Sequence, residues 1–149
     1  MKKIMIVDDN YLSAEGIEKN IDWETLNAEI IHVCYNGTSA IEAMKKEPAD
    51  LIISDIEMPD LDGISMSRQA LEINPMVKII LISAYDKFEY ARRALLLGAL
   101  DYIEKPLDYA YLIQKVKNAF ALMEKEQKNL QLLKQSRPLL TEKFFREIT

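Results

Sequence analysis

Three aspartates, a serine and a lysine follow short apolar runs of the chain within two residues. Asp8 and Asp9 follow one run, Asp55 a second, Ser83 a third and Lys105 a fourth. In an open sheet of parallel strands, ligands bind beyond the carboxyl ends of the strands. If the runs are such strands, these five side chains converge on one edge of a sheet.

The three aspartates have the chemistry of a metal-assisted phosphoryl site. Carboxylates that lie close together repel one another and raise each other's pKa unless a cation sits among them. Mg²⁺ fits best, because it accepts one or two carboxylates and keeps several waters. A carboxylate can also attack phosphorus and form an acyl phosphate. The pattern predicts Mg²⁺ among Asp8, Asp9 and Asp55, with Asp55 as the nucleophile and Lys105 offsetting charge on the transferring group.

Each of these residues also has an ordinary structural explanation. Asp8 could cap the helix that follows it, and Lys105 could be a solvated surface cation. Their joint arrival at the ends of four expected strands favours the phosphate-and-metal interpretation over these separate explanations.

Five apolar runs alternate with amphipathic segments along the chain. The runs are mostly unbroken, which suits parallel strands that are covered on both faces. In the segments between them, such as 40–44 and 90–97, apolar residues return at three- and four-residue steps, as in helices. We expect an α/β fold, (βα)₅, with a doubly wound five-stranded parallel sheet and right-handed crossovers. The expected strands are 4–7, 30–34, 51–53, 77–82 and 100–103.

The C-terminal segment differs from the rest. From Asp108 the pattern is helical, with no strong breaker before Pro138, and a further apolar face follows that proline. Glu126 and Arg137 interrupt an apolar spacing that resembles a heptad seam. The seam consists of Leu112, Val116, Ala119, Met123, Leu130, Leu133 and Leu140. We expect residues 126–149 to be a helical linker, with the potential to form a coiled coil, that leads to an output domain beyond Thr149.

Composition excludes several classes of protein. The chain is 49% hydrophobic with a net charge of −5, which argues against disorder and against a nucleic-acid groove within these residues. The single cysteine, Cys34, cannot form an internal disulfide. No secretory signal precedes the first expected strand and no apolar run reaches the roughly 20 residues of a membrane span. The cytoplasm is the expected location.

Four segments together resemble the receiver domain of bacterial two-component response regulators. They are residues 5–9, 55–63, 83–85 and 98–106, and the resemblance covers residues 1–125. It implies a flavodoxin-like and CheY-like fold and a phosphoacceptor switch rather than an enzyme, although such domains assist their own phosphorylation and dephosphorylation.

The resemblance implies specific roles around the expected acceptor. A partner sensor histidine kinase would donate phosphate to Asp55. Asp9, Asp55 and the backbone carbonyl of Glu57 would bind Mg²⁺ directly, and Asp8 would bind it largely through water. Glu57 and Tyr85 would occupy positions that influence the access of hydrolytic water.

The resemblance also implies the parts of a switch. Ser83 and Lys105 would contact phosphoryl oxygens, and the ring of Tyr102 would swing inward as Ser83 moves toward the phosphate. The Lys105–Pro106 peptide bond would be cis, which would aim Lys105 into the site.

A finer resemblance concerns segments 16–23 and 83–91 and the long tail. These look like the subgroup of regulators that carries an AraC-type DNA-binding domain with two helix-turn-helix motifs. DNA would then be contacted only by that output domain. A homodimer would form either through the fourth helix, fifth strand and fifth helix or through the C-terminal helix.

Three other classes remain open at the level of sequence. The first is a stand-alone receiver that relays phosphate or binds a protein, although the long tail disfavours it. The second is a haloacid-dehalogenase-like phosphohydrolase, in which a second aspartate would stand where Glu57 is. The third is a flavodoxin-like nucleotide-binding protein. It is disfavoured because the sequence has only four glycines and no Gly-rich phosphate loop.

Overall fold

The computed structural model of the 149-residue chain describes residues 1–84 and 88–148. The side chains of residues 88, 90, 91 and 136–148 are outside the described set. Strands and helices alternate from the N-terminus, as the sequence predicts. The elements are β1 (Lys2–Val7), α1 (Tyr11–Asn20), β2 (Ala28–Cys34), α2 (Gly37–Lys46), β3 (Leu51–Asp55), α3 (Gly63–Ile73), β4 (Lys78–Ser83), α4 (Phe88–Leu97), β5 (Asp101–Glu104) and α5 (Tyr109–Ile148).

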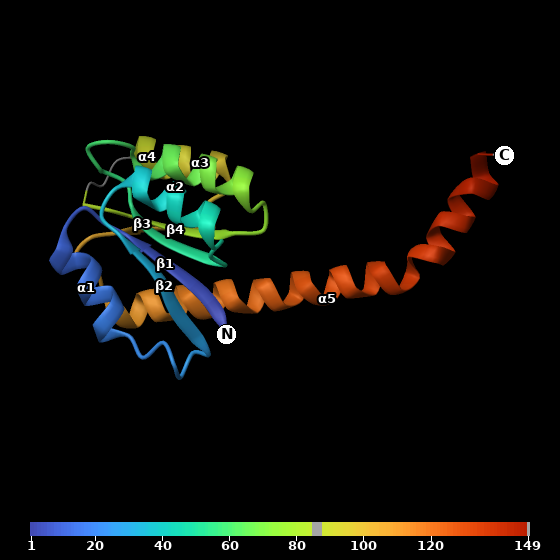
Figure 1. The fold of residues 1–149 in the computed structure, drawn as a ribbon, viewed down its shortest axis with the longest axis horizontal. Coiled ribbons are helices and arrows are strands. Elements are labelled where there is room, and N and C mark those ends of the chain that lie inside the picture. Colours follow the sequence, from blue (N-terminus) through green and yellow to red (C-terminus); the bar gives the residue numbers. More distant parts are fainter. Residues whose placement is uncertain (85–87, 149) are drawn as a thin grey trace.

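All five strands form one parallel sheet in the order β2-β1-β3-β4-β5. Helices α2, α3 and α4 cover one face, and α1 and the first part of α5 cover the other (Figure 1). Alternate residues of each strand enter the two cores: Met5 lies in the core beneath α2 and α3, whereas Ile4 and Ile6 lie in the core beneath α1 and α5. The predicted (βα)₅ architecture is confirmed.

Asparagine and aspartate side chains begin the first three helices. Asn10, Asn36 and Asp62 are the N-caps of α1, α2 and α3, and each accepts hydrogen bonds from backbone N–H groups of the first turn. Gly63 follows the last cap, and a Cβ there would lie 2.2 Å from the backbone oxygen of Asp55. The absence of a side chain at Gly63 therefore lets α3 start directly against the end of β3.

The heptad-like spacing in α5 serves mainly the domain core. Leu112, Val116 and Ala119 are fully buried on the face of α5 that covers the sheet. The three- and four-residue spacing that makes a coiled-coil seam is also the spacing with which a helix covers a sheet. A seam available to a partner helix is therefore restricted to the part beyond the domain, where Leu130 and Leu133 are 47% and 56% exposed.

Pro138, the first strong breaker in the expected helix, does not end it, because α5 continues to Ile148. Figure 1 shows α5 leaving the domain and changing direction in its distal part, and a bend is the usual result when a helix continues past a proline. Leu140 and the apolar face predicted after Pro138 lie outside the described side chains.

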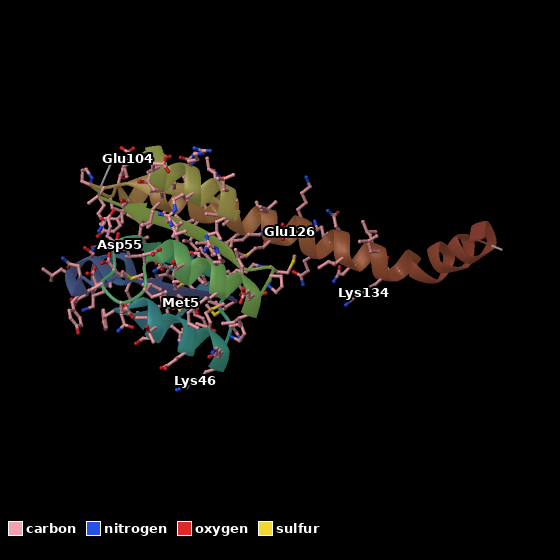
Figure 2. All side chains as sticks on the ribbon, turned by 90° about the horizontal axis from the view of Figure 1, so that it is seen from above. Met5, Lys46, Asp55, Glu104, Glu126 and Lys134 are labelled. Atoms are coloured by element: carbon pink, nitrogen blue, oxygen red, sulfur yellow. The ribbon has the colours of Figure 1, made fainter. Side chains whose placement is uncertain are left out.

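Glu126 interrupts the apolar spacing because it has a partner on the domain. Its carboxylate lies 2.7 Å from the ammonium of Lys78, at the start of β4, and both side chains are partly buried. Figure 2 shows Glu126 where α5 passes the domain and Lys134 farther along the projecting helix. The ion pair thus joins α5 to the sheet close to the point where the helix leaves it. Among the described residues, no helix has the length and apolarity needed to cross a bilayer.

Candidate functional site

The carboxyl ends of the strands bring the three predicted aspartates together. Oxygens of Asp8, Asp9 and Asp55 all lie within 4.8 Å of one another. Asp8 and Asp55 are only 3% and 6% exposed, whereas Asp9 is exposed to solvent. Figure 2 shows Asp55 at the same end of the domain as Glu104, the residue before Lys105, and away from Glu126.

The Lys105 side chain supplies the positive charge at this end of the sheet. Its ammonium lies 3.6 Å from Oδ2 of Asp55 and 3.8 Å from Oδ2 of Asp8. These distances are those of ion pairs rather than of short hydrogen bonds. The Lys105 amide donates to the backbone oxygen of Ser83 at 2.8 Å, and the Lys105–Pro106 peptide bond is cis. Strand pairing thus fixes the base of Lys105 beside the aspartates.

Crowding of the carboxylates shifts their pKa values. Burial raises the pKa of Asp55 to about 6, the charges of Asp8 and Glu57 add to the rise, and Lys105 opposes it. Burial likewise raises the pKa of Asp8, against a hydrogen bond from the Asn10 amide and the charge of Lys105. One ammonium therefore does not fully compensate the negative charge.

The donors fit a hard divalent cation. All three side chains offer carboxylate oxygens, which Mg²⁺ and similar ions prefer, and a cation among them would relieve the repulsion that raises the pKa values. The acidic cluster is therefore able to hold a metal ion.

Ser83 is fully buried at the end of β4, and its hydroxyl donates to Oε1 of Glu57 at 2.7 Å. The sequence predicted a role for the backbone carbonyl of Glu57 but missed this side-chain contact. No sequence signal specifies it, because it depends on how the segments after two neighbouring strands lie side by side. Tyr85, the other residue expected to influence water access, lies outside the described residues.

Tyr102 is partly buried on β5 and packs against the core beneath α2, α3 and α4. It adjoins a shallow pocket whose lining includes Glu104, Pro106, Asp108 and Tyr111. The ring thus belongs to the β5 side of the domain, close in sequence to Lys105.

A pair of tyrosine rings near the aspartates was not predicted. The rings of Tyr11 and Tyr35 lie with centroids 4.1 Å apart, and both help to line a shallow pocket with Asp9. The only sequence signal for this pair is that Tyr35 directly follows an expected strand, 30–34. Asp60 lines the same pocket, but hydrogen bonds, chiefly with Thr38 at the start of α2, lower its pKa to about 2. We therefore regard Asp60 as an acceptor for the first amides of α2 rather than as a metal ligand.

The comparisons with known proteins agree with this geometry. The family model of the response regulator receiver domain matches residues 4–117. YesN of Bacillus subtilis, an uncharacterized transcriptional regulatory protein, is 29% identical over 126 residues, which cover 85% of this chain and 34% of YesN. The chain spans from 34% to 44% of the length of these curated relatives.

Two solved structures have the same fold. The REC domain of AraT, a response regulator from Geobacillus stearothermophilus, is 34% identical with a TM-score of 0.79, over 85% of this chain and 98% of that one. A two component transcriptional regulator AraC from Clostridium phytofermentans is 30% identical with a TM-score of 0.76, over 87% of this chain and 99% of that one. With its buried acidic cluster at the carboxyl end of a five-stranded parallel sheet, the chain belongs to the response regulator receiver domain family.

Proposed function

We propose that Asp55 accepts a phosphoryl group from the phosphohistidine of a sensor histidine kinase in the cytoplasm. The observation that carries this proposal is the position of Asp55, which lies at the end of the central strand β3, beside Asp8, Asp9 and Lys105. An Asp55 oxygen attacks phosphorus and forms an oxygen–phosphorus bond. The nitrogen–phosphorus bond breaks, and its electron pair stays on the imidazole nitrogen of the donor.

Asp9 and Asp55, with the backbone carbonyl of Glu57, are the proposed direct ligands of Mg²⁺, and Asp8 binds it largely through water. The close approach of the three carboxylates supports this assignment. When bound, Mg²⁺ offsets negative charge on the oxygens of the transferring group. Lys105 contributes a second positive charge from the end of β5, at the same edge of the sheet, since its ammonium already lies near Asp55.

Ser83 and Tyr102 are the proposed switch residues. Ser83 lies on β4 and Tyr102 on the adjacent strand β5, so a movement of the Ser83 side chain takes place close to Tyr102. After phosphorylation, the Ser83 hydroxyl and the Lys105 ammonium contact phosphoryl oxygens. The phosphoryl group thereby shifts the population between two arrangements of this side of the domain.

The proposed output is regulation of transcription. YesN and the AraC regulator are named as transcriptional regulators, and α5 projects from the domain as a connector would. Residues 1–125 act as the receiver and residues 126–149 as the helical linker to an AraC-type DNA-binding domain. That domain makes the DNA contacts, in keeping with the net charge of −5 on this chain.

Two surfaces can form a homodimer of the regulator. On α5 beyond the domain, Leu130, Leu132 and Leu133 are exposed. On α4, the helix that would take part in the α4-β5-α5 surface, Leu95 and Leu96 are 66% and 77% exposed. Exposed leucines at either surface would be covered by a second copy.

The phosphoacceptor assignment is tested by incubation with acetyl phosphate and Mg²⁺, followed by intact-mass measurement. The wild-type chain is expected to gain the mass of one phosphoryl group, and D55N to gain none. Asp60→Asn serves as a matched control, because Asp60 lies on the rim of the site but its carboxylate accepts a hydrogen bond from the start of α2. Equal labelling of D55N and wild type would overturn the assignment.

A further inference from the structure

The end of β3 and the end of β4 place two side chains in direct contact. Asp55 pairs in register with Ile82, and the next amide, that of Ile56, donates to the Ile82 oxygen at 3.0 Å. The pairing therefore continues one residue beyond β3. Glu57 emerges beside Ser83, and its Oε1 accepts the Ser83 hydroxyl at 2.7 Å.

The Ser83 hydroxyl has one proton to donate. In this arrangement it is donated to a carboxylate, which makes a charge-assisted hydrogen bond stronger than a neutral one. Ser83 is fully buried and Glu57 partly so, which lessens competition from water. The bond therefore holds the hydroxyl on Glu57 instead of leaving it free to turn toward Asp55.

A phosphoryl group on Asp55 would oppose this contact in two ways. Its oxygens would require the same Ser83 proton, and its negative charge would repel the Glu57 carboxylate. The charge of Glu57 already acts at Asp55, since it contributes to the raised pKa of that carboxyl. The arrangement with Ser83 on Glu57 and the arrangement with Ser83 on the phosphoryl group thus exclude each other.

We propose that Glu57 is a positioning residue that holds the Ser83 hydroxyl in the unphosphorylated arrangement, so that switching requires this hydrogen bond to break. The inference rests on the proposed function of Asp55 as the phosphoacceptor. It gives the Glu57 side chain a role separate from that of its backbone carbonyl. Phosphorylation then has to overcome the Ser83–Glu57 bond before Ser83 can bind the phosphoryl group.

The test uses beryllium trifluoride with Mg²⁺ as a phosphoryl mimic on the full 149-residue chain. Binding is followed by NMR through the backbone amides of Tyr102 and Lys105 in wild type, E57A, S83A and the double variant. Loss of a charge-assisted hydrogen bond is expected to make E57A bind the mimic about tenfold more tightly than wild type. In the S83A background, E57A is expected to increase the affinity for the mimic much less, because there is no Ser83 hydroxyl for the replacement to release.

E57Q is the matched variant, since it keeps the length of the side chain and an acceptor oxygen but removes the charge. It is expected to bind the mimic with an affinity between those of wild type and E57A. An equal gain from E57A with and without the Ser83 hydroxyl would show that charge alone matters and would overturn the proposal. No gain from E57A or E57Q, in variants whose unfolding midpoints show an intact fold, would also overturn it.

D55N separates failure of this inference from failure of the proposed function. If wild type does not bind the mimic, or if D55N binds it as well, the phosphoacceptor assignment itself is wrong. If wild type binds and D55N does not, but the Glu57 variants show no coupling to Ser83, only the role of the Glu57 side chain is refuted.

Discussion

Replacing Asp55 with asparagine removes a negative charge that the folded protein disfavours. Burial and the neighbouring acids raise the pKa of Asp55 from 3.8 to about 6. At about 1.36 kcal/mol for each pH unit, the ionised carboxylate costs the metal-free native state up to about 3 kcal/mol. Asparagine also loses the ion pair with Lys105, 3.6 Å away. We therefore expect D55N to have a free energy of unfolding higher by about 1–2 kcal/mol at neutral pH.

The sign of the pH dependence follows from the direction of the shift. A carboxyl whose pKa is raised by folding contributes stability that is fully present below the pKa of the unfolded chain and is lost as pH rises through the folded value. For Asp55 this window extends from 3.8 to about 6. The excess of the free energy of unfolding of D55N over that of wild type is thus largest above about pH 6 and disappears below pH 3.8.

Urea denaturation with a chelator, followed by circular dichroism across this pH range, measures the effect. Mg²⁺ is expected to raise the stability of wild type more than that of D55N, because the variant lacks one proposed ligand. Asp60→Asn is the control of opposite sign: hydrogen bonding lowers the pKa of Asp60 to about 2, so its charge stabilises the fold at neutral pH. If D55N is no more stable than wild type at neutral pH, or if the difference does not change with pH, the inference that the folded protein disfavours the ionised form of Asp55 is refuted.

Four further substitutions, in three tests, examine how the site and α5 are held. K78M and E126Q are each expected to destabilise the junction of α5 with the sheet, with a coupling of about 1 kcal/mol in a double-mutant cycle; zero coupling would show that the 2.7 Å ion pair contributes nothing. G63A is expected to lower the free energy of unfolding by roughly 1–3 kcal/mol, because its Cβ would lie 2.2 Å from the Asp55 backbone oxygen, and an unchanged urea midpoint would contradict this. K105A is expected to keep the fold by circular dichroism but to slow labelling by acetyl phosphate, and wild-type labelling kinetics would argue against a charge-offsetting role.

The sequence was sufficient to predict the sheet and the edge at which the acids meet. Unbroken apolar runs predicted the strands, and the residues after them, such as Asp8, Asp55 and Lys105, follow from strand direction alone. The structure brings these three side chains together. This success has a simple physical basis, because parallel strands all end at the same edge.

The sequence was less informative where one pattern serves two structures. The spacing of Leu112, Val116 and Ala119 suits both a coiled-coil seam and a helix on a sheet, and only the fold shows that these residues are buried in the domain. Contacts between the ends of different strands also have no sequence pattern. The hydrogen bond from Ser83 to Glu57 depends on the β3-β4 register and on side-chain rotamers.

The central claim is that the Asp55 carboxylate itself carries the phosphoryl group. Borohydride reduces an acyl phosphate of aspartate to homoserine, so treatment of the chain after incubation with acetyl phosphate and Mg²⁺ marks the acceptor, and peptide mass spectrometry locates it. We predict homoserine at position 55 and unmodified aspartate at Asp8 and Asp9, with no conversion when Mg²⁺ is removed by a chelator. Conversion at Asp8 or Asp9 with residue 55 unmodified would contradict the account.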